Sequence, residues 1–158
     1  MAAVRPYSMN PNLPSERDFD PYGGDLDAQC AWRNFGGLTL EEAIRRFRER
    51  PELYQEDFMH MGGRAFDYYY PVIDRFLRDT LSLSGDEIDD RQSWILPQCI
   101  RNQFEGKNLP YVRNRKREVL ELCEFMLSNL KVFARDWDPP SEIESQWTQL
   151  RSHLQNLC

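Results

Sequence analysis

Residues 32–77 constrain the fold of this chain more than any other stretch, because apolar residues recur there at helical spacing between capping signals and breaks. Thr39 is followed three residues later by Glu42, which makes a capping box typical of the first turn of a helix. Pro51 and the glycine pair at 62–63 interrupt the stripe, since proline lacks a backbone N–H and glycine rotates freely. The stretch therefore predicts one helix between Leu38 and Pro51, a second over 52–61 and a third over 64–81.

The C-terminal half predicts three more helices. Gly85 opens the first of them, and the carboxylates in its early turns suit the positive end of the helix dipole. The second, about 112–134, is the longest, and its broad apolar stripe is typical of a central core helix. The last follows the proline pair at 139–140, where Ser141 and Glu144 repeat the capping-box spacing.

Two prolines fall inside these predicted helices. Pro71 and Pro97 each remove a backbone donor, so each predicts a kink or a restart. No segment shows the alternation of a half-buried strand over a useful length, and no internal repeat is present. We therefore predict an all-α fold, a single-domain bundle of five to six helices with proline kinks.

The chain length of 158 residues suits one domain with a hydrophobic core of its own. Residues 1–27 are rich in proline and lack periodicity, so we expect an extended N-terminal arm there and a helical domain over 28–158. The arm either frays or lies over the core or a partner, and its anchors would then be Tyr7, Phe19 and Tyr22.

The net charge of -6 excludes a general nucleic-acid binder or a binder of anionic membranes, since both need a dominant positive field. The charge is also polarised along the chain, because residues 101–118 hold six Lys or Arg and two Asp or Glu. We therefore expect another protein as the partner, with no nucleic acid and no membrane.

The four cysteines form no Cys-x-x-Cys pair, and no secretory leader or long apolar run accompanies them. Reduced thiols are the default for such a chain, which predicts a cytoplasmic protein without a membrane span. The cysteines are Cys30, Cys99, Cys123 and Cys158.

No catalytic or cofactor fingerprint is present. Glu56 and His60 lie one helical turn apart, but two histidines in the whole chain do not supply the three or four ligands of a zinc site. No nucleophile elbow, P-loop or dinucleotide motif occurs. We therefore predict no metal, no cofactor and no catalytic residue, and a protein that is not an enzyme.

Charged residues supply the first candidate binding sites. A basic cluster begins the predicted helix at 112–134, where the helix dipole disfavours cations. Either the acidic run of the preceding helix folds against this cluster, or a partner's anionic surface neutralises it. The basic cluster is Arg113, Arg115, Lys116 and Arg117, and the acidic run is Asp86, Glu87, Asp89 and Asp90.

Three consecutive tyrosines supply the second candidate site. Neighbouring helix positions point about 100° apart, so at least one of these hydroxyls is expected at the surface. Tyrosine and arginine often dominate interface energies, which makes Tyr68, Tyr70 and the nearby Arg64 candidate partner-binding residues. The alternative is that these tyrosines lie at the rim of the core.

The segments GGLTLEEAIRRF and EDFMHMGGRAFDYYYPVIDRFL, with the piece formed by Ala65, Phe66, Tyr68, Tyr69 and Pro71, resemble small bacterial all-helical proteins of the toxin-immunity kind. The resemblance implies a compact acidic protein that binds a toxin and occludes its catalytic cleft.

The resulting hypothesis is a protein-binding module of the immunity type. Its acidic run would steer a basic toxin domain, and Arg64 with the exposed tyrosines would anchor it. The alternative is a small enzyme or ligand-binding protein that acts on an anionic metabolite through Arg113, Arg115 and Tyr69. A self-associating scaffold built on the last helix is a third option.

Overall fold

The computed structural model describes residues 13–84, 95–135 and 139–157, and these residues form helices and no β-strand. The expected all-α class is confirmed. The helices are α1 (Glu16–Phe19), α2 (Leu26–Phe35), α3 (Leu40–Glu49), α4 (Pro51–Tyr54), α5 (Asp57–His60), α6 (Gly63–Arg78), α8 (Leu96–Gln103), α9 (Leu109–Val112), α10 (Lys116–Ser128), α11 (Leu130–Phe133) and α12 (Pro140–Gln155), with 3₁₀ turns η2 (Asp79–Ser82), η3 (Gly106–Asn108) and η4 (Arg113–Arg115).

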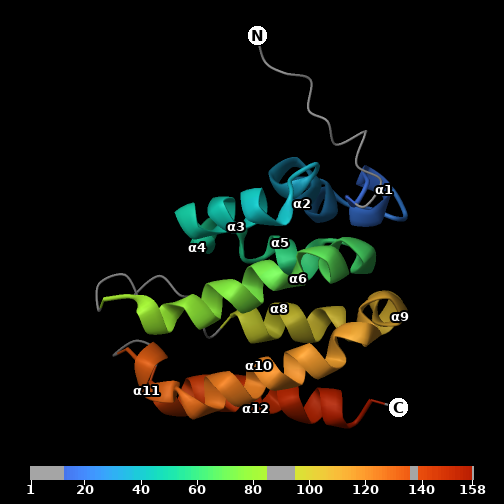
Figure 1. Ribbon diagram of the computed structural model, residues 1–158. Helices are drawn as coiled ribbons and strands as arrows, with labels where there is room; N and C mark the ends of the chain where they lie inside the picture. The colour runs from blue at the N-terminus through green and yellow to red at the C-terminus, as the bar shows by residue number, and fades with distance from the viewer. Residues whose placement is uncertain (1–12, 85–94, 136–138, 158) are drawn as a thin grey trace.

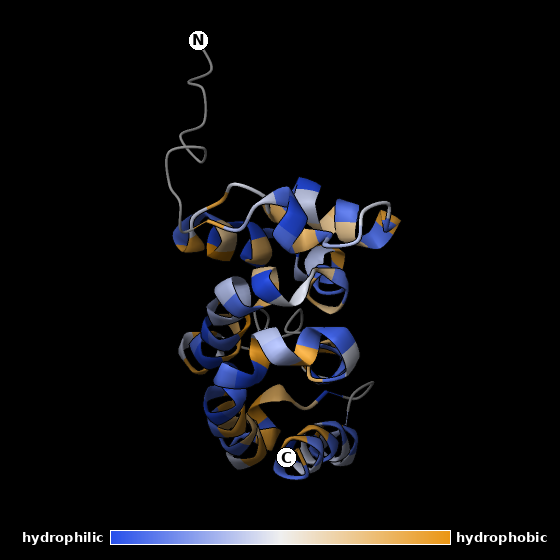
Figure 2. Cartoon of the chain, turned by 90° about the vertical axis from the view of Figure 1, so that its right-hand side faces the viewer, coloured by the Kyte–Doolittle hydropathy of each residue, from blue (hydrophilic) through white to orange (hydrophobic). Residues whose placement is uncertain are grey.

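The helices stack in layers along one long direction of the molecule (Figure 1). The first layer contains α1 to α4, α6 crosses beneath it, α8 follows, and α10 with α12 closes the other end. Figure 2 shows that most helices carry hydrophilic and hydrophobic residues side by side, as expected for helices that each bury one face.

The expected count of five to six helices is wrong for two reasons: two predicted helices are broken into shorter pieces, and α1 and α2 form where no helix was predicted. The segment 52–61 becomes α4 and α5, and the segment 112–134 becomes η4, α10 and α11 behind α9. Asn129 ends α10 with φ -130° and donates its side-chain N–H to the carbonyl oxygen of Phe125 at 2.7 Å. A continuous apolar stripe therefore does not guarantee a continuous helix.

The helix signals were correct in some places and wrong in others. The capping box of Thr39 is confirmed, since its Oγ1 accepts from the Glu42 N–H at 3.2 Å. Pro71 lies inside the unbroken helix α6, whereas Pro97 occupies the first turn of α8, where its missing N–H costs nothing. The second predicted capping box is wrong, because Pro139 caps α12 without any side-chain bond.

Part of the expected N-terminal arm is folded. Ser15 and Asp18 form a capping box at the start of α1, and Phe19 at its end is fully buried. The Phe19 ring lies 5.4 Å from the ring of Trp32 and 5.8 Å from that of Tyr69. Tyr22, in contrast, is 72% exposed, and Tyr7 lies outside the described residues. The extended-arm prediction is therefore wrong for residues 16–19.

The core is rich in aromatic rings that meet edge to face. The ring of Phe47 lies 4.8 Å from that of Phe76 and 5.5 Å from that of Phe58, which joins α3, α5 and α6. Such contacts add about 0.5–1.5 kcal/mol beyond area burial. Gln103, fully buried on α8, donates its side-chain N–H to the carbonyl oxygens of Phe58 and Met61 at 3.0 and 2.7 Å, which fixes the end of α5.

The buried hydroxyl of Tyr69 provides a test of this core. It lies 2.7 Å from the carbonyl oxygen of Leu38 and 3.0 Å from that of Phe35. We expect Tyr69→Phe to lower the free energy of unfolding by about 1–2 kcal/mol, because the substitution leaves buried acceptors without this donor. Tyr68→Phe, at the half-exposed neighbour, should change it by less than about 0.5 kcal/mol. Urea denaturation of both variants checks this, and equal effects would contradict it.

Candidate functional site

Three of the predicted binding residues line one cavity. Arg64, Tyr68 and Arg115 line an open hollow of about 500 Å³, together with Tyr111 and with Asp18 of α1. We call it the Tyr68 hollow. Arg64 and Tyr111 are exposed, and Tyr68 is half-buried. The fold therefore places residues from α1, α6, α9 and η4 around one surface depression.

Arg115 is neutralised within the protein. Its Nε donates to the carbonyl oxygen and the Oδ1 of Asp67 at 3.0 and 3.1 Å, and its Nη1 donates to Glu118 Oε2 at 2.8 Å. The described partners of Arg115 are thus Asp67 and Glu118, and the expectation that the acidic run folds against the basic cluster concerns residues outside the described ones. Arg117 pairs in the same way with Glu121 at 3.3 Å. The acidic residues 86–90 lie outside the described residues.

Tyr70 is not a surface anchor, which corrects the prediction made for it. Its side chain is fully buried, and its hydroxyl lies 3.4 Å from Asp74 Oδ1. Burial raises the pKa of Tyr70 well above its ordinary value. Tyr69 is also fully buried, so it is not available to the anionic ligand for which it was considered.

A second hollow of about 380 Å³ adjoins the first and shares Asp18, Arg64 and Tyr111 with it. We call it the Arg64 hollow. The guanidinium of Arg64 lies 4.7 Å from the centre of the Tyr111 ring, and the ammonium of Lys107 lies 4.5 Å from that of Tyr22. We call the surface formed by both hollows the Arg64 face, and it comprises Arg17, Tyr22, Arg64, Tyr68, Lys107 and Tyr111.

The cations of the Arg64 hollow have no carboxylate as an ion-pair partner among the described residues. Within the part of the chain that the structure describes, Arg17, Arg64 and Lys107 form no ion pair with a carboxylate, whereas eight other arginines do. Those eight are Arg48, Arg50, Arg75, Arg78, Arg101, Arg115, Arg117 and Arg151. The lining of the Arg64 hollow therefore carries three cations and one carboxylate, that of Asp18, in a protein that is acidic overall.

Sequence reasoning missed three members of this face, Arg17, Lys107 and Tyr111, and named the fourth, Tyr22, only as an anchor of the arm. Arg17 and Tyr22 were assigned to the arm, although the Ser15-x-x-Asp18 spacing of a capping box marks the helix that carries Arg17. Lys107 and Tyr111 lie in the basic stretch 101–118, but only folding brings them against the start of α6.

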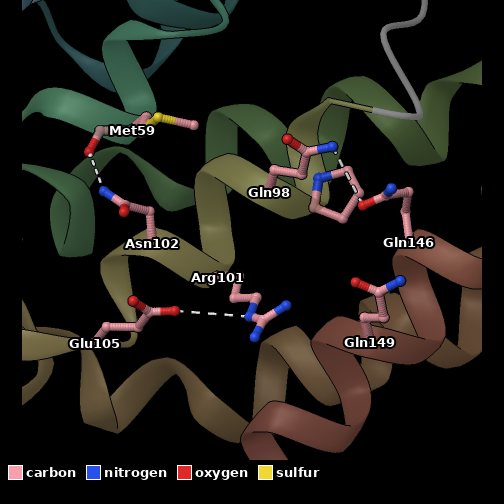
Figure 3. Close-up of a pocket in the computed structure, with 8 residues that line it drawn as sticks. Met59, Gln98, Arg101, Asn102, Glu105, Gln146 and Gln149 are labelled. Atoms are coloured by element: carbon pink, nitrogen blue, oxygen red, sulfur yellow. Dashed lines mark hydrogen bonds and ion pairs between the residues drawn. The ribbon is translucent and has the colours of Figure 1, made fainter.

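Figure 3 shows another hollow, of about 360 Å³, between α8 and α12. Side-chain amides dominate it, and Gln98 Nε2 donates to Gln146 Oε1 across it at 3.3 Å. Its one cation, Arg101, pairs with Glu105 at 3.6 Å. This hollow contains none of the predicted binding residues and lacks uncompensated charge, so we rank it below the Arg64 face.

Metal binding and thiol chemistry receive no support from the described residues. Residues 13–84, 95–135 and 139–157 contain no group of three His, Cys, Asp or Glu arranged to hold a metal ion. Burial raises the pKa of Cys99 and of Cys123 to about 12, which keeps both as unreactive thiols near neutral pH. None of the described helices is both long and apolar enough to cross a bilayer.

Comparison with known proteins gives no relative for this chain: no family model, no curated protein and no solved structure matches it.

Proposed function

We propose that this protein is a binding module that engages another protein through the Arg64 face. One observation carries the proposal. Around two adjoining hollows, exposed tyrosine rings lie against cations that form no ion pair with a described carboxylate. Tyrosine and arginine supply large contact areas and directed hydrogen bonds, and they are enriched among residues that dominate binding energies. Hollows beside them can accept protruding side chains of a partner.

The charge of the face determines the chemistry of the partner surface. Arg17, Arg64 and Lys107 favour a partner that presents carboxylates, because opposite charges speed encounter and fix orientation. The overall charge of -6 repels a uniformly acidic partner at longer range. The proposed partner therefore carries an acidic patch on an otherwise neutral or basic body.

Toxin neutralisation is the specific form of this proposal. A basic toxin domain with a local acidic patch suits both the face and the acidic body of this protein. In this form Asp86, Glu87, Asp89 and Asp90 steer the toxin during approach, and Arg64 with Tyr111 and Tyr68 anchors it.

Capture experiments with charge variants test the proposal. The immobilised protein is exposed to lysate of its source organism, and retained proteins are identified by mass spectrometry. We expect a stoichiometric partner to be retained by the native chain and by Arg45→Glu, a charge reversal on α3 outside the face. The double variant Arg64→Glu, Tyr111→Ala should bind that partner at least about tenfold more weakly, the loss expected from one hot-spot contact of about 1.4 kcal/mol.

Two outcomes would contradict the proposal. Equal retention by the double variant and by Arg45→Glu excludes the Arg64 face as the contact surface. For the toxin form, lysine at all four positions of the acidic run should slow association with the captured partner. An unchanged association rate in a folded quadruple variant excludes electrostatic steering by that run.

A further inference from the structure

The Arg64 hollow has the dimensions of a small-molecule site. Its volume of about 380 Å³ lies between α1, the start of α6 and the segment 107–111. Ligand pockets in proteins typically measure about 300–1,000 Å³ and combine apolar walls with a few directed polar groups. Here the rings of Tyr22 and Tyr111 supply the walls.

The charge inside this hollow is unbalanced. Arg17, Arg64 and Lys107 line it, and the single carboxylate among the lining residues is Asp18. Oδ2 of Asp18 accepts the N–H of Ser15 at 2.9 Å and its hydroxyl at 3.2 Å, so this carboxylate is engaged in capping α1. Three cations and one carboxylate leave the lining with two excess positive charges, and an anion placed among the cations relieves their repulsion.

Two of the cations are oriented before any ligand arrives. The Arg64 guanidinium stacks over the Tyr111 ring at 4.7 Å, and the Lys107 ammonium stacks over the Tyr22 ring at 4.5 Å. A guanidinium stacked on a ring keeps the N–H groups at its edge free to donate, and its planar fork matches the oxygens of a phosphate. Because the fold already orders these long side chains, ligand binding costs less side-chain entropy.

We propose that the Arg64 hollow binds a small phosphate compound, with Arg17, Arg64 and Lys107 holding its phosphate or diphosphate group. Three cations match the charge of a diphosphate better than that of a single carboxylate. The rings of Tyr22 and Tyr111 are 72% and 43% exposed and offer a stacking surface to an aromatic ring carried by the same ligand. A nucleoside diphosphate is the simplest compound with both groups. This site needs no partner protein and therefore goes beyond the proposed function.

Titration followed by NMR tests the site on the full chain. Sodium pyrophosphate, ADP and, as a reference of equal ionic strength, sodium chloride are added to the ¹⁵N-labelled protein. We expect saturable shifts with pyrophosphate at the amides of Gly63, Arg64, Lys107 and Asn108, and none with chloride. If the rings of Tyr22 and Tyr111 stack on the adenine, ADP should bind more tightly than pyrophosphate. Equal affinities would mean that the hollow recognises only the phosphate group of its ligand.

A matched pair of double variants provides the control. Arg64→Ala with Lys107→Ala removes two cations of the hollow and should weaken pyrophosphate binding by at least about tenfold. Arg45→Ala with Lys131→Ala removes the same two residue types from exposed positions on α3 and α11 and should leave the affinity unchanged. Circular dichroism confirms that both variants are folded.

Two results would overturn this inference. One is the absence of saturable shifts up to ~10 mM pyrophosphate, a weaker affinity than any built site would show. The other is an equal loss of affinity in both double variants, which would indicate attraction by overall charge. Neither result tests the proposal of a protein partner. That proposal is tested separately, by capture from lysate without added pyrophosphate or ADP.

Discussion

Asp57→Asn is expected to raise the free energy of unfolding by up to about 3 kcal/mol near neutral pH. Asp57 begins α5, is only 7% exposed, and accepts the side-chain N–H of Asn34 on its Oδ2 at 2.8 Å. Burial raises the pKa of this carboxyl to about 6 from its ordinary 3.8, and the bond from Asn34 offsets only part of that effect. The ionised side chain is therefore a cost to the fold that a neutral amide removes.

The pH dependence of this gain follows from the two pKa values. Because the folded-state pKa is the higher one, the folded protein holds the proton more tightly than the unfolded chain does. The carboxyl therefore costs nothing below about pH 3.8 and costs most above about pH 6. The gain from Asp57→Asn should appear fully at about pH 7 and vanish by about pH 3.

Urea denaturation at both pH values measures this gain. Asp27→Asn is the matched control, because Asp27 lies on the adjacent α2, 71% exposed, with its Oδ2 4.0 Å from His60 Nδ1. Its removal should change the free energy of unfolding by less than about 0.5 kcal/mol. A gain of the same size at both pH values, or a loss of stability near neutral pH, would show that burial does not penalise the ionised Asp57.

Gly62→Ala is expected to lower the free energy of unfolding by about 2–3 kcal/mol, the range of overpacking in a tight interface. A Cβ at this position would lie 2.3 Å from the carbonyl oxygen of Asp18 and 3.2 Å from that of Phe19. Both contacts involve backbone atoms of the α1 region, which cannot move aside by a rotamer change. The Gly62 N–H also donates to the Phe19 carbonyl oxygen at 2.8 Å. A direct backbone hydrogen bond therefore holds the end of α1 against the start of α6.

Gly62→Ala should change both the tryptophan fluorescence and the affinity for pyrophosphate. Displacement of α1 separates Phe19 from Trp32, whose rings lie 5.4 Å apart, and should alter tryptophan fluorescence. Displacement also moves Arg17 and should weaken pyrophosphate binding in the Arg64 hollow. Gly24→Ala is the control: its φ of 83° costs an alanine about 1–2 kcal/mol, but no atom lies within 4 Å of the added Cβ. Unchanged fluorescence in Gly62→Ala would mean that α1 tolerates the added methyl group.

The local features of this fold were predictable from the sequence because they depend on residues a few positions apart. The capping box of Thr39 and Glu42, and the buried stripe of Ala43, Ile44 and Phe47 that follows it, are properties of a single helix. The breaks within 52–61 and 112–134 were not predictable in the same way, because helices as short as α4 and α11 are held by their neighbours.

The candidate site was only partly predictable for the same reason. Arg64 and Tyr68 were identified from their residue types, but nothing local distinguished Tyr68 from Tyr70, since which helix face is covered depends on the packing of α6 against other helices. Arg115 was expected to face an acidic run or a partner; it pairs with Glu118, three positions away, and with Asp67, which is 48 positions away and which no local pattern indicates.

The sequence by itself determined the all-α class, the buried apolar stripes and the acidic character of this protein, because composition and short-range periodicity carry that information. Only the tertiary structure decided that three cations line one hollow. Arg17, Arg64 and Lys107 come from three separate segments. They meet in one hollow because α1 approaches the start of α6 at Gly62 and the segment of Asn108 approaches it at Gly63. Long-range packing of this kind has no signature in the spacing of neighbouring residues.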